Sequence, residues 1–317
     1  MSYELPPMRP PSEARSLLVR VMRGCPWNYC TFCSAYKDVP RKALMRSTEE
    51  VKGDIDELRA AAEEARGRGY VVEPRTAFLA DSNAIIIRTA DLAEIVAYLL
   101  EAFPSLERVT SYGRAKTVLA KSADELRGLR RAGLDRLHLG LESGDDGVLE
   151  RVKKGATSEQ MIAAGLRVKE AGFELSEYVM PGLGGRDGSQ QHVEGTARVL
   201  NAIDPHYTRV RSLVLAPGTP LYQEYEAGRF RAMSVLDLTH EIRALVERLD
   251  ITGQLCFDHF SNPPFLRQEW EGYKFPEEKE VVLSTIDAAL ERRRARLEDG
   301  QAHPLEEGPG PMIGSRL

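Results

Sequence analysis

Short apolar runs with strand character alternate along the chain with longer segments whose apolar residues recur at helical spacing. The strand candidates are residues 17–22, 76–80, 106–110, 136–141, 173–180 and 207–215. The helix candidates between them are residues 47–67, 91–103, 122–133, 157–171 and 190–201. Ser47 with Glu50, and Ser122 with Glu125, have the spacing of a capping box at a helix start. This alternation predicts an α/β fold with parallel strands joined by right-handed helical crossovers.

Residues beyond 220 follow a different pattern. Helical spacing returns over residues 221–230, 236–249 and 276–297, with a polar, proline-rich stretch at 257–264. The final stretch is rich in Gly and Pro and predicts a disordered tail. We therefore expect a leader (1–14), a core domain (15–230), a mostly helical C-terminal extension that packs on or caps the core (231–297) and the tail (298–317).

Composition limits the function classes. The chain is 42% hydrophobic and 29% charged, with a net charge of -5 and both signs interspersed, so we expect no general nucleic-acid binding and no membrane association. No apolar run approaches the roughly 20 residues needed to span a bilayer. The first residues are polar and proline-rich, unlike a signal peptide, so we expect a cytoplasmic protein.

Three of the four cysteines lie within nine positions, directly after the first strand candidate. Cys25, Cys30 and Cys33 have the spacing C-x4-C-x2-C, which favours metal or redox chemistry over a disulfide framework. Three thiolates suit a four-iron cluster and leave one iron without a protein ligand. A structural zinc site is the alternative, but it needs a fourth Cys or His. The nearest histidine in sequence is His138, and Cys256 is farther still.

Other polar residues also follow predicted strands. Asp81 and Ser82 follow the second strand, residues 111–114 the third, Glu142 and Ser143 the fourth, and residues 181–185 the fifth. Functional groups gather at the carboxyl ends of parallel strands both in open doubly wound sheets and in barrels. The two architectures are therefore equally compatible with the strand pattern, and both place these residues at one functional edge.

These motifs together resemble the radical S-adenosylmethionine (radical SAM) superfamily over roughly residues 15–230. Besides the cysteine loop, with Phe32 before its last cysteine, the matching motifs are residues 138–144 running on to Lys154-Gly155, residues 180–185 and residues 216–222. They are similar to the coproporphyrinogen-oxidase and methylthiotransferase branch. The resemblance implies a partial (β/α)6 barrel in which Cys25, Cys30 and Cys33 hold a [4Fe-4S] cluster. The amino and carboxylate groups of S-adenosylmethionine would then chelate the fourth iron.

Two features depart from the family pattern. The loop has one residue more than the common C-x3-C-x2-C spacing, and we expect Trp27 or Asn28 to bulge without displacing a ligand. The usual Gly-Gly-Glu after the second strand is replaced by Ala80-Asp81-Ser82. An oxygen of Asp81 or Ser82 can still accept a hydrogen bond from the cofactor's ammonium group.

The resemblance also implies contacts to the cofactor from the later strand ends. Glu142 matches a residue that binds the ribose or methionyl part, although its carboxylate could instead stabilise the next helix's N-terminus. Ser111 and Arg114 lie where the branch contacts ribose and carboxylate, with a surface salt bridge as the alternative for Arg114. Gly182 lies in a turn that lets backbone approach the adenine, or it is a plain strand-to-helix turn.

Several further polar residues have structural interpretations beside the functional ones. Arg209 and Arg211 alternate on the sixth strand and share one face. Burial there is costly unless they bind an anionic ligand or pair internally. We therefore expect one of them to contact the cofactor's carboxylate or an acidic substrate, with an internal pair as the alternative. His138 and Cys256 are expected to be core residues. Residues 258–262 form either a substrate cap or a hydrogen-bonded turn. No catalytic residue is assigned.

We therefore expect an enzyme that reductively cleaves S-adenosylmethionine to a 5′-deoxyadenosyl radical, which acts on a small or medium organic substrate. Such an enzyme needs an external electron donor of the flavodoxin or ferredoxin kind. The alternatives are a non-catalytic iron–sulfur protein, for electron transfer or regulation, and a zinc-stabilised α/β binding protein. No second cysteine group suggests an auxiliary cluster. Because the first strand starts near residue 16, we expect no cobalamin domain before it.

Overall fold

The computed structural model describes residues 8–37, 43–267 and 272–298. The predicted tail from residue 299 and residues 1–7 of the predicted leader lie outside the described residues. The chain divides into two units by its internal packing. The first consists of Met1–Asn28, Asp38–Leu139 and Ala164–Leu175, and the second of Tyr29–Lys37, Gly140–Ala163 and Ser176–Leu317. The domain boundaries expected from the sequence remain a prediction.

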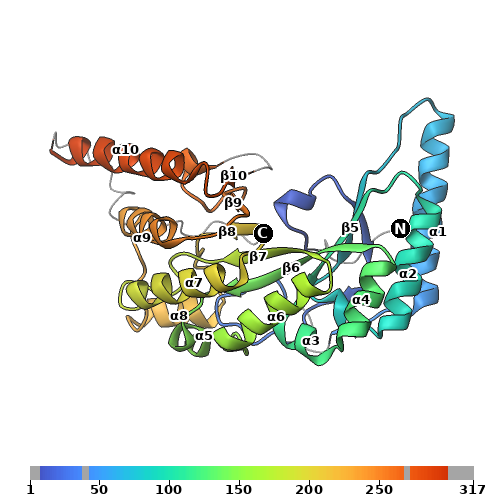
Figure 1. Cartoon of the computed structure of the whole chain (residues 1–317), viewed down its shortest axis with the longest axis horizontal. Coiled ribbons are helices and arrows are strands. Elements are labelled where there is room, and N and C mark those ends of the chain that lie inside the picture. Colours follow the sequence, from blue (N-terminus) through green and yellow to red (C-terminus); the bar gives the residue numbers. More distant parts are fainter. Residues whose placement is uncertain (1–7, 38–42, 268–271, 299–317) are drawn as a thin grey trace. The chain divides into compact units, whose positions relative to one another are not determined.

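Parallel strands form the centre of the first unit (Figure 1). In order of pairing they are β1 (Leu17–Arg20), β4 (Thr76–Ala80), β5 (Arg108–Gly113) and β6 (Leu134–Glu142), of which residues 140–142 belong to the second unit. Val19 lies opposite Leu79, Leu79 opposite Ser111, and Ser111 opposite Leu137. All four side chains are buried, as the near-continuous apolar strands predict.

Three helices of the first unit pack side by side: α1 (Thr48–Gly67), α2 (Thr89–Ala102) and α4 (Ala123–Arg131) (Figure 1). The capping boxes predicted at the starts of α1 and α4 are both present, with reciprocal side-chain and backbone hydrogen bonds. The shorter elements are η1 (Pro11–Glu13), η2 (Ala84–Ile86), α3 (Ala115–Ala120) and an antiparallel pair, β2 (Met22–Arg23) with β3 (Leu44–Met45).

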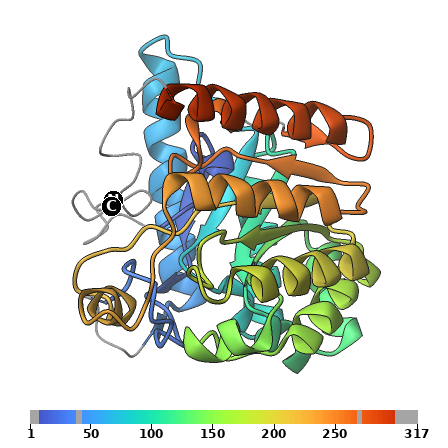
Figure 2. The same ribbon diagram turned by 90° about the vertical axis from the view of Figure 1, so that its left-hand side faces the viewer.

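In the second unit, β7 (Glu174–Val179), β8 (Tyr207–Val210) and β9 (Gln254–Cys256) are parallel, and β10 (Tyr273–Lys274) is antiparallel to β9. The first two residues of β7 belong to the first unit. Among the helices, α9 (Val235–Arg248) packs against both α7 (Ser189–Ile203) and α10 (Lys279–Glu298) (Figure 2). The remaining elements are α5 (Asp146–Arg151), α6 (Ser158–Glu170), which runs on into the first unit, α8 (Pro220–Glu226) and η3 (Pro264–Leu266).

The expected fold class is confirmed: parallel strands alternate with helices, and the C-terminal part is mostly helical. The sixth predicted strand is wrong in its length, because β8 ends at Val210 and not at Leu215. There the amide of Ser212 donates to the side chain of Asn262 at 3.1 Å, so a side chain replaces a neighbouring strand as the partner. The third predicted strand is longer than expected, and β5 continues through Ser111 to Gly113.

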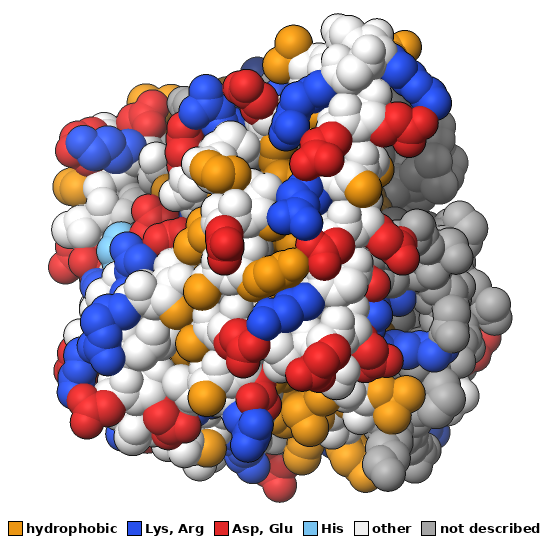
Figure 3. All heavy atoms as spheres, turned by 90° about the vertical axis from the view of Figure 1, so that its right-hand side faces the viewer, with side chains coloured by type: hydrophobic (Ala, Val, Ile, Leu, Met, Phe, Trp, Pro, Cys, Tyr) orange, Lys and Arg blue, Asp and Glu red, His pale blue; other side chains and the backbone are white. Residues whose placement is uncertain are grey.

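Basic and acidic side chains are interspersed on the molecular face in Figure 3, in line with the balanced composition. None of the helices in the described ranges combines the length and the apolar character that a bilayer span requires.

Candidate functional site

The backbone of Gly24, the residue before Cys25, is held by two side chains from the end of β4. Its amide donates to Asp81 Oδ2 at 3.1 Å, and its carbonyl accepts from Ser82 Oγ at 2.8 Å. Gly24 has a φ of 78°, which a residue with a Cβ rarely adopts. Asp81 and Ser82 therefore fix the point at which the chain enters the cysteine loop.

Asp81 is almost fully buried, with 2% of its surface exposed. Its Oδ1 lies 3.5 Å from Nε of Arg20, which is itself buried. Burial raises the pKa of the Asp81 carboxyl, and the charge of Arg20 and the amide of Gly24 oppose that rise. The residues predicted to receive the cofactor's ammonium group thus already have partners within the protein.

The backbone of the cysteine loop changes direction at Asn28. Its φ of 45° lies in the left-handed region, and its amide lies 3.4 Å from Sγ of Cys25. Two cationic side chains lie over the ring of the neighbouring Trp27. The guanidinium carbon of Arg114 is 5.0 Å from the ring centroid, and Nζ of Lys116 is 5.6 Å from it. The backbone thus turns sharply at Asn28, Arg114 packs on the loop itself, and the expected bulge remains a prediction.

The other two cysteines belong to a segment anchored in the second unit. Between them, the amide of Thr31 donates to the carbonyl of Val152 at 2.9 Å, and the carbonyl of Thr31 accepts from the amide of Leu221 at 3.0 Å. Phe32 packs against an apolar cluster that includes Val152, Leu183 and Leu221. Backbone bonds and apolar contacts thus hold the segment that carries Cys30 and Cys33.

The loop's thiols suit metal binding in their chemical state. Cys25, Cys30 and Cys33 are free and partly exposed, whereas Cys256 at the end of β9 is buried at 1% exposure. Among the described residues, no three side chains of the His, Cys, Asp or Glu type are arranged as a metal site. The donor set itself, three thiols with an amide directed at one sulfur, fits an iron–sulfur cluster with one iron left open.

Glu142 at the end of β6 forms an ion pair that sequence analysis did not predict. Its Oε1 lies 2.9 Å from Nζ of Lys154, and both side chains are largely buried. Glu142 has a φ of 62°, so its backbone turns sharply as the strand ends. The pair lies over Gly140, where an added Cβ would overlap Glu142 Oε1 and come within 2.8 Å of Lys154 Nζ. The absence of a side chain at position 140 makes room for the pair.

Glu177 on β7 is a second acidic residue near this pair. It is 1% exposed, and its Oε2 has no hydrogen-bond partner within the described chain. Burial raises the pKa of Glu177 to about 8, the charge of Lys154 opposes this, and the charge of Glu142 adds to it. Glu177 is therefore largely protonated at neutral pH, which leaves Lys154 to pair with Glu142.

A buried polar network connects the residue after Glu142 with the glycine turn after β7. Ser143 Oγ lies 2.9 Å from Nδ1 of His192, and Nε2 of His192 lies 3.9 Å from Oε1 of Glu241. Glu241 also accepts from the amide of Gly182 at 2.5 Å and from the hydroxyl of Ser189. Burial lowers the pKa of His192, although the charge of Glu241 opposes this, so the ring is neutral. Glu241 on α9 thus holds the turn at Gly182.

Two glycines pack backbone against backbone beside this network. A Cβ on Gly144 would lie 2.7 Å from Cα of Thr196, and a Cβ on Gly195 would lie 2.6 Å from the carbonyl oxygen of Gly144. The Gly144 amide donates to Oγ1 of Thr196 at 3.0 Å. Helix α7 can approach the loop after β6 this closely only because neither position has a side chain.

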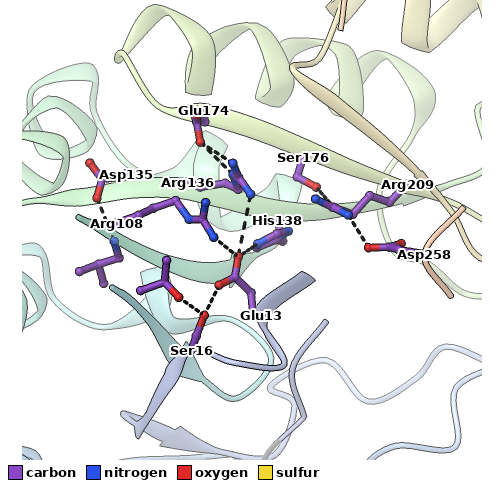
Figure 4. A network of polar contacts seen from close by, with 12 residues as sticks. Glu13, Ser16, Arg108, Asp135, Arg136, His138, Glu174, Ser176, Arg209 and Asp258 are labelled. Carbon is purple, nitrogen blue, oxygen red and sulfur yellow. Dashed lines mark hydrogen bonds and ion pairs between the residues drawn. The ribbon is translucent and has the colours of Figure 1, made fainter. Parts of the chain in front are cut away.

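Arg209 on β8 pairs internally, one of the two outcomes expected for it. Its guanidinium is 1% exposed, forms an ion pair with Asp258, and donates through Nε to Ser176 Oγ at 3.1 Å (Figure 4). Burial raises the pKa of Asp258, and the charge of Arg209 opposes this. Arg211 lies beyond the end of β8 and is only partly buried.

His138 belongs to a separate buried network in the first unit (Figure 4). Its Nε2 lies 3.4 Å from Oε1 of Glu13, and Ser16 Oγ donates to Glu13 Oε2 at 2.5 Å. Burial alone would raise the pKa of Glu13, but the hydrogen bond and charge of His138, with Ser16 and Arg108, lower it to about 2. His138 is fully buried, as expected for a core residue.

Ser111 lies inside β5, with no exposed surface, and its hydroxyl is 3.4 Å from the carbonyl of Tyr112. Of the other predicted site residues, Asp81 and Ser82 both bond Gly24, and Arg114 packs on Trp27. No pattern in the sequence marked Lys154, Glu177 or Glu241 as part of the site. A charged residue within the apolar strand 173–180 was the available signal for Glu177.

The fold and the loop define an α/β protein with a three-cysteine iron–sulfur motif after its first parallel strand. The sequence profile of the Radical SAM superfamily matches residues 19–200, more than half of the chain, and the chain belongs to this superfamily. The enzymes of this superfamily use a [4Fe-4S] cluster and S-adenosylmethionine, so the expected superfamily, enzyme class and cofactors are confirmed.

The chain is only moderately similar in sequence to individual proteins. The chain is 30% identical to the heme chaperone HemW of Bacillus subtilis over 109 residues, which are 34% of this chain and 28% of that protein. It is 28% identical to a tRNA-2-methylthio-N(6)-dimethylallyladenosine synthase of Thiobacillus denitrificans over 254 residues, 76% of this chain and 52% of that protein. The chain thus spans about half or less of the length of these relatives.

The structure of HydG, a maturase of the [FeFe]-hydrogenase, superposes with a TM-score of 0.52 at 14% identity, over 87% of this chain and 57% of that one. This likeness concerns the fold alone.

Proposed function

We propose that this chain cleaves S-adenosylmethionine reductively at a [4Fe-4S] cluster held by Cys25, Cys30 and Cys33, and acts on a small or medium organic substrate. The observation that carries the proposal is the loop itself. It has three free thiols, Gly24 is fixed by the side chains of Asp81 and Ser82, and Thr31 and Phe32 are fixed by backbone bonds and core packing. The superfamily match includes this loop.

When bound, the two cofactors supply cleavage of the sulfonium C–S bond to methionine and a 5′-deoxyadenosyl radical, which takes a hydrogen atom from the substrate. The protein's part in such chemistry is to bind, orient and exclude water. Asp81 and Ser82 set the entry of the loop, and the backbone bonds of Thr31 set its exit.

Glu142 and Gly182 are the residues we propose for contact with S-adenosylmethionine away from the cysteines. The carboxylate of Glu142 suits ribose hydroxyls and is oriented by Lys154. The turn at Gly182 is held by Glu241, which leaves its backbone fixed for an approach to adenine. Arg114 packs on Trp27, so we assign it first to the shape of the loop.

The external partners follow from this chemistry. Reduction of the cluster needs an electron donor, which we propose to be a flavodoxin or ferredoxin. A cytoplasmic location and the absence of general nucleic-acid binding remain predictions.

Reductive cleavage tests the proposal directly. Protein reconstituted anaerobically with iron and sulfide, then reduced with dithionite, should release 5′-deoxyadenosine and methionine from S-adenosylmethionine. Alanine at Cys25, Cys30 or Cys33 should abolish this, and Cys256→Ala, the matched control at a buried cysteine, should not. A cluster spectrum unchanged by S-adenosylmethionine would indicate a non-catalytic iron–sulfur protein, and stoichiometric zinc without iron would indicate the zinc-stabilised alternative. Either result would overturn the proposal.

A further inference from the structure

The segment after β9 is bound tightly to the segment after β8. Asn262 Nδ2 donates to the carbonyl of Val210 at 2.7 Å, and its Oδ1 accepts from the amide and the hydroxyl of Ser212, both at 3.1 Å. Asn262 is 1% exposed. One side chain thus bonds the residues on both sides of Arg211 and fixes the backbone from which that arginine extends.

The same asparagine orients a second arginine. The carbonyl of Asn262 accepts from Nε of Arg267 at 2.9 Å. A backbone carbonyl satisfies one donor of a guanidinium without neutralising its charge. Arg211 directly follows the carboxyl end of β8, the kind of position where parallel α/β folds place their functional groups. Arg267 follows η3, and Asn262 holds both the backbone beside Arg211 and the guanidinium of Arg267.

Neither arginine has an acidic partner in the part of the chain that the structure describes. Within the described ranges, no acidic side chain forms an ion pair with Arg211 or Arg267. The nearby acid of the segment, Asp258, pairs with Arg209 instead. Because Arg209 pairs with Asp258, the positive charges of Arg211 and Arg267 have no acidic counterpart among residues 8–37, 43–267 and 272–298.

His259 contributes a third donor. Its Nδ1 accepts from the amide of Ser261 at 3.2 Å and lies 2.7 Å from the Ser261 hydroxyl. Because the amide can only donate, Nδ1 is an acceptor, and the neutral ring carries its proton on Nε2. Burial, followed by the charges of Arg211 and Arg267, lowers the pKa of His259 to about 3. The ring thus stays neutral at physiological pH, with an N–H donor at Nε2.

We propose that Arg211, Arg267 and the Nε2–H of His259 form a subsite that binds an oxyanion of the substrate, either a carboxylate or a phosphate group. Guanidinium groups bind both oxyanions through paired, charge-assisted hydrogen bonds. That the bound group belongs to a substrate rests on the proposed function, whereas the binding of an oxyanion by these residues does not.

The test is a titration of the reconstituted full chain with inorganic phosphate and, separately, with malonate, by isothermal calorimetry at constant ionic strength. At least one of the two should bind, and the tighter of them identifies the oxyanion. Arg211→Gln or Arg267→Gln should weaken binding about tenfold, as expected for the loss of one charge-assisted contact, and the double variant should abolish it. Arg198→Gln is the control, because Arg198 forms a surface ion pair with Glu159 in the same unit.

Two readouts separate this proposal from the function it extends. The double variant should still show the spectral change with S-adenosylmethionine and still release 5′-deoxyadenosine, which also shows that it is folded. If wild-type protein binds neither anion, or if the double variant binds as wild type does, the subsite is refuted. If the double variant instead loses affinity for S-adenosylmethionine, the arginines bind the cofactor and the substrate assignment is refuted. Failure of wild-type cleavage with intact anion binding would count against the proposed function alone.

Discussion

Asp81 Oδ2 accepts a hydrogen bond from the amide of Gly24 at 3.1 Å. A side chain at the end of β4 thereby fixes the position of the residue that precedes the first cysteine. We expect Asp81→Ala to lower the iron and sulfide retained per chain after reconstitution and gel filtration. The same change leaves the buried Arg20 without this carboxylate, so it should also cost about 3 kcal/mol in the free energy of unfolding.

Ser82→Ala should have a smaller effect of about 1 kcal/mol, with a modest loss of iron, because it removes one hydroxyl bond to the Gly24 carbonyl. Ser105→Ala is the matched control, since Ser105 donates to the Pro74 carbonyl at the same 2.8 Å. Equal iron content in all three variants would show that Asp81 and Ser82 do not position the loop.

Gly140→Ala should disturb the Glu142–Lys154 ion pair and leave the cysteine loop intact, because the new methyl group would occupy the space of both charged ends. We expect normal cluster content but an affinity for S-adenosylmethionine at least about tenfold weaker, measured by the spectral titration. Gly53→Ala in α1 is the control, because nothing lies within 4 Å of its added Cβ. Unchanged affinity in Gly140→Ala would remove Glu142 from the proposed cofactor site.

Glu13 should stabilise the fold at neutral pH. Its pKa is about 2 in the folded state against 4.5 for an unperturbed carboxyl, so its contribution is complete above pH 4.5 and is lost as the pH falls toward 2. Glu13→Gln should therefore be about 3 kcal/mol less stable than wild type at pH 7, and the difference should shrink as the pH falls through this window. Urea unfolding across the pH range measures it, and a constant difference would contradict the assignment.

Glu177 should act in the opposite direction. Its pKa is about 8 in the folded state against 4.5 for an unperturbed carboxyl. The contribution of the protonated side chain to the free energy of unfolding is therefore complete below pH 4.5 and is lost as the pH rises toward 8. Glu177→Gln keeps the shape without the charge, and at pH 8 it should be roughly 4 kcal/mol more stable than wild type. The two proteins should converge below pH 4.5. A glutamine variant less stable than wild type at pH 8 would show that Glu177 is ionised in the fold.

Local signals predicted much of this fold. The capping boxes at Ser47 and Ser122 are present because their bonds join residues three apart, which the sequence shows directly. The strand over residues 76–80 has the predicted bounds, since a buried strand is a continuous apolar run. The short strands β9 and β10 were missed, because two or three residues carry no readable alternation.

The candidate site was harder to predict where a residue's partner is distant in sequence. Two arginines on one strand suggested an anion or an internal pair, and only the structure shows that Asp258, 49 residues away, pairs with Arg209. Asp81 and Ser82 resemble cofactor contacts in sequence, yet they bond a backbone 57 and 58 residues earlier. Sequence patterns indicate which residues are unusual, and tertiary packing decides what each one contacts.

The approach of Gly144 to Gly195 has a consequence for how this molecule can vary. Most packed pairs tolerate a larger residue on one side if the other becomes smaller. Here each position faces the other's backbone, which no substitution can shorten, so no compensating exchange exists. A library randomised at both positions should return glycine at both among active clones.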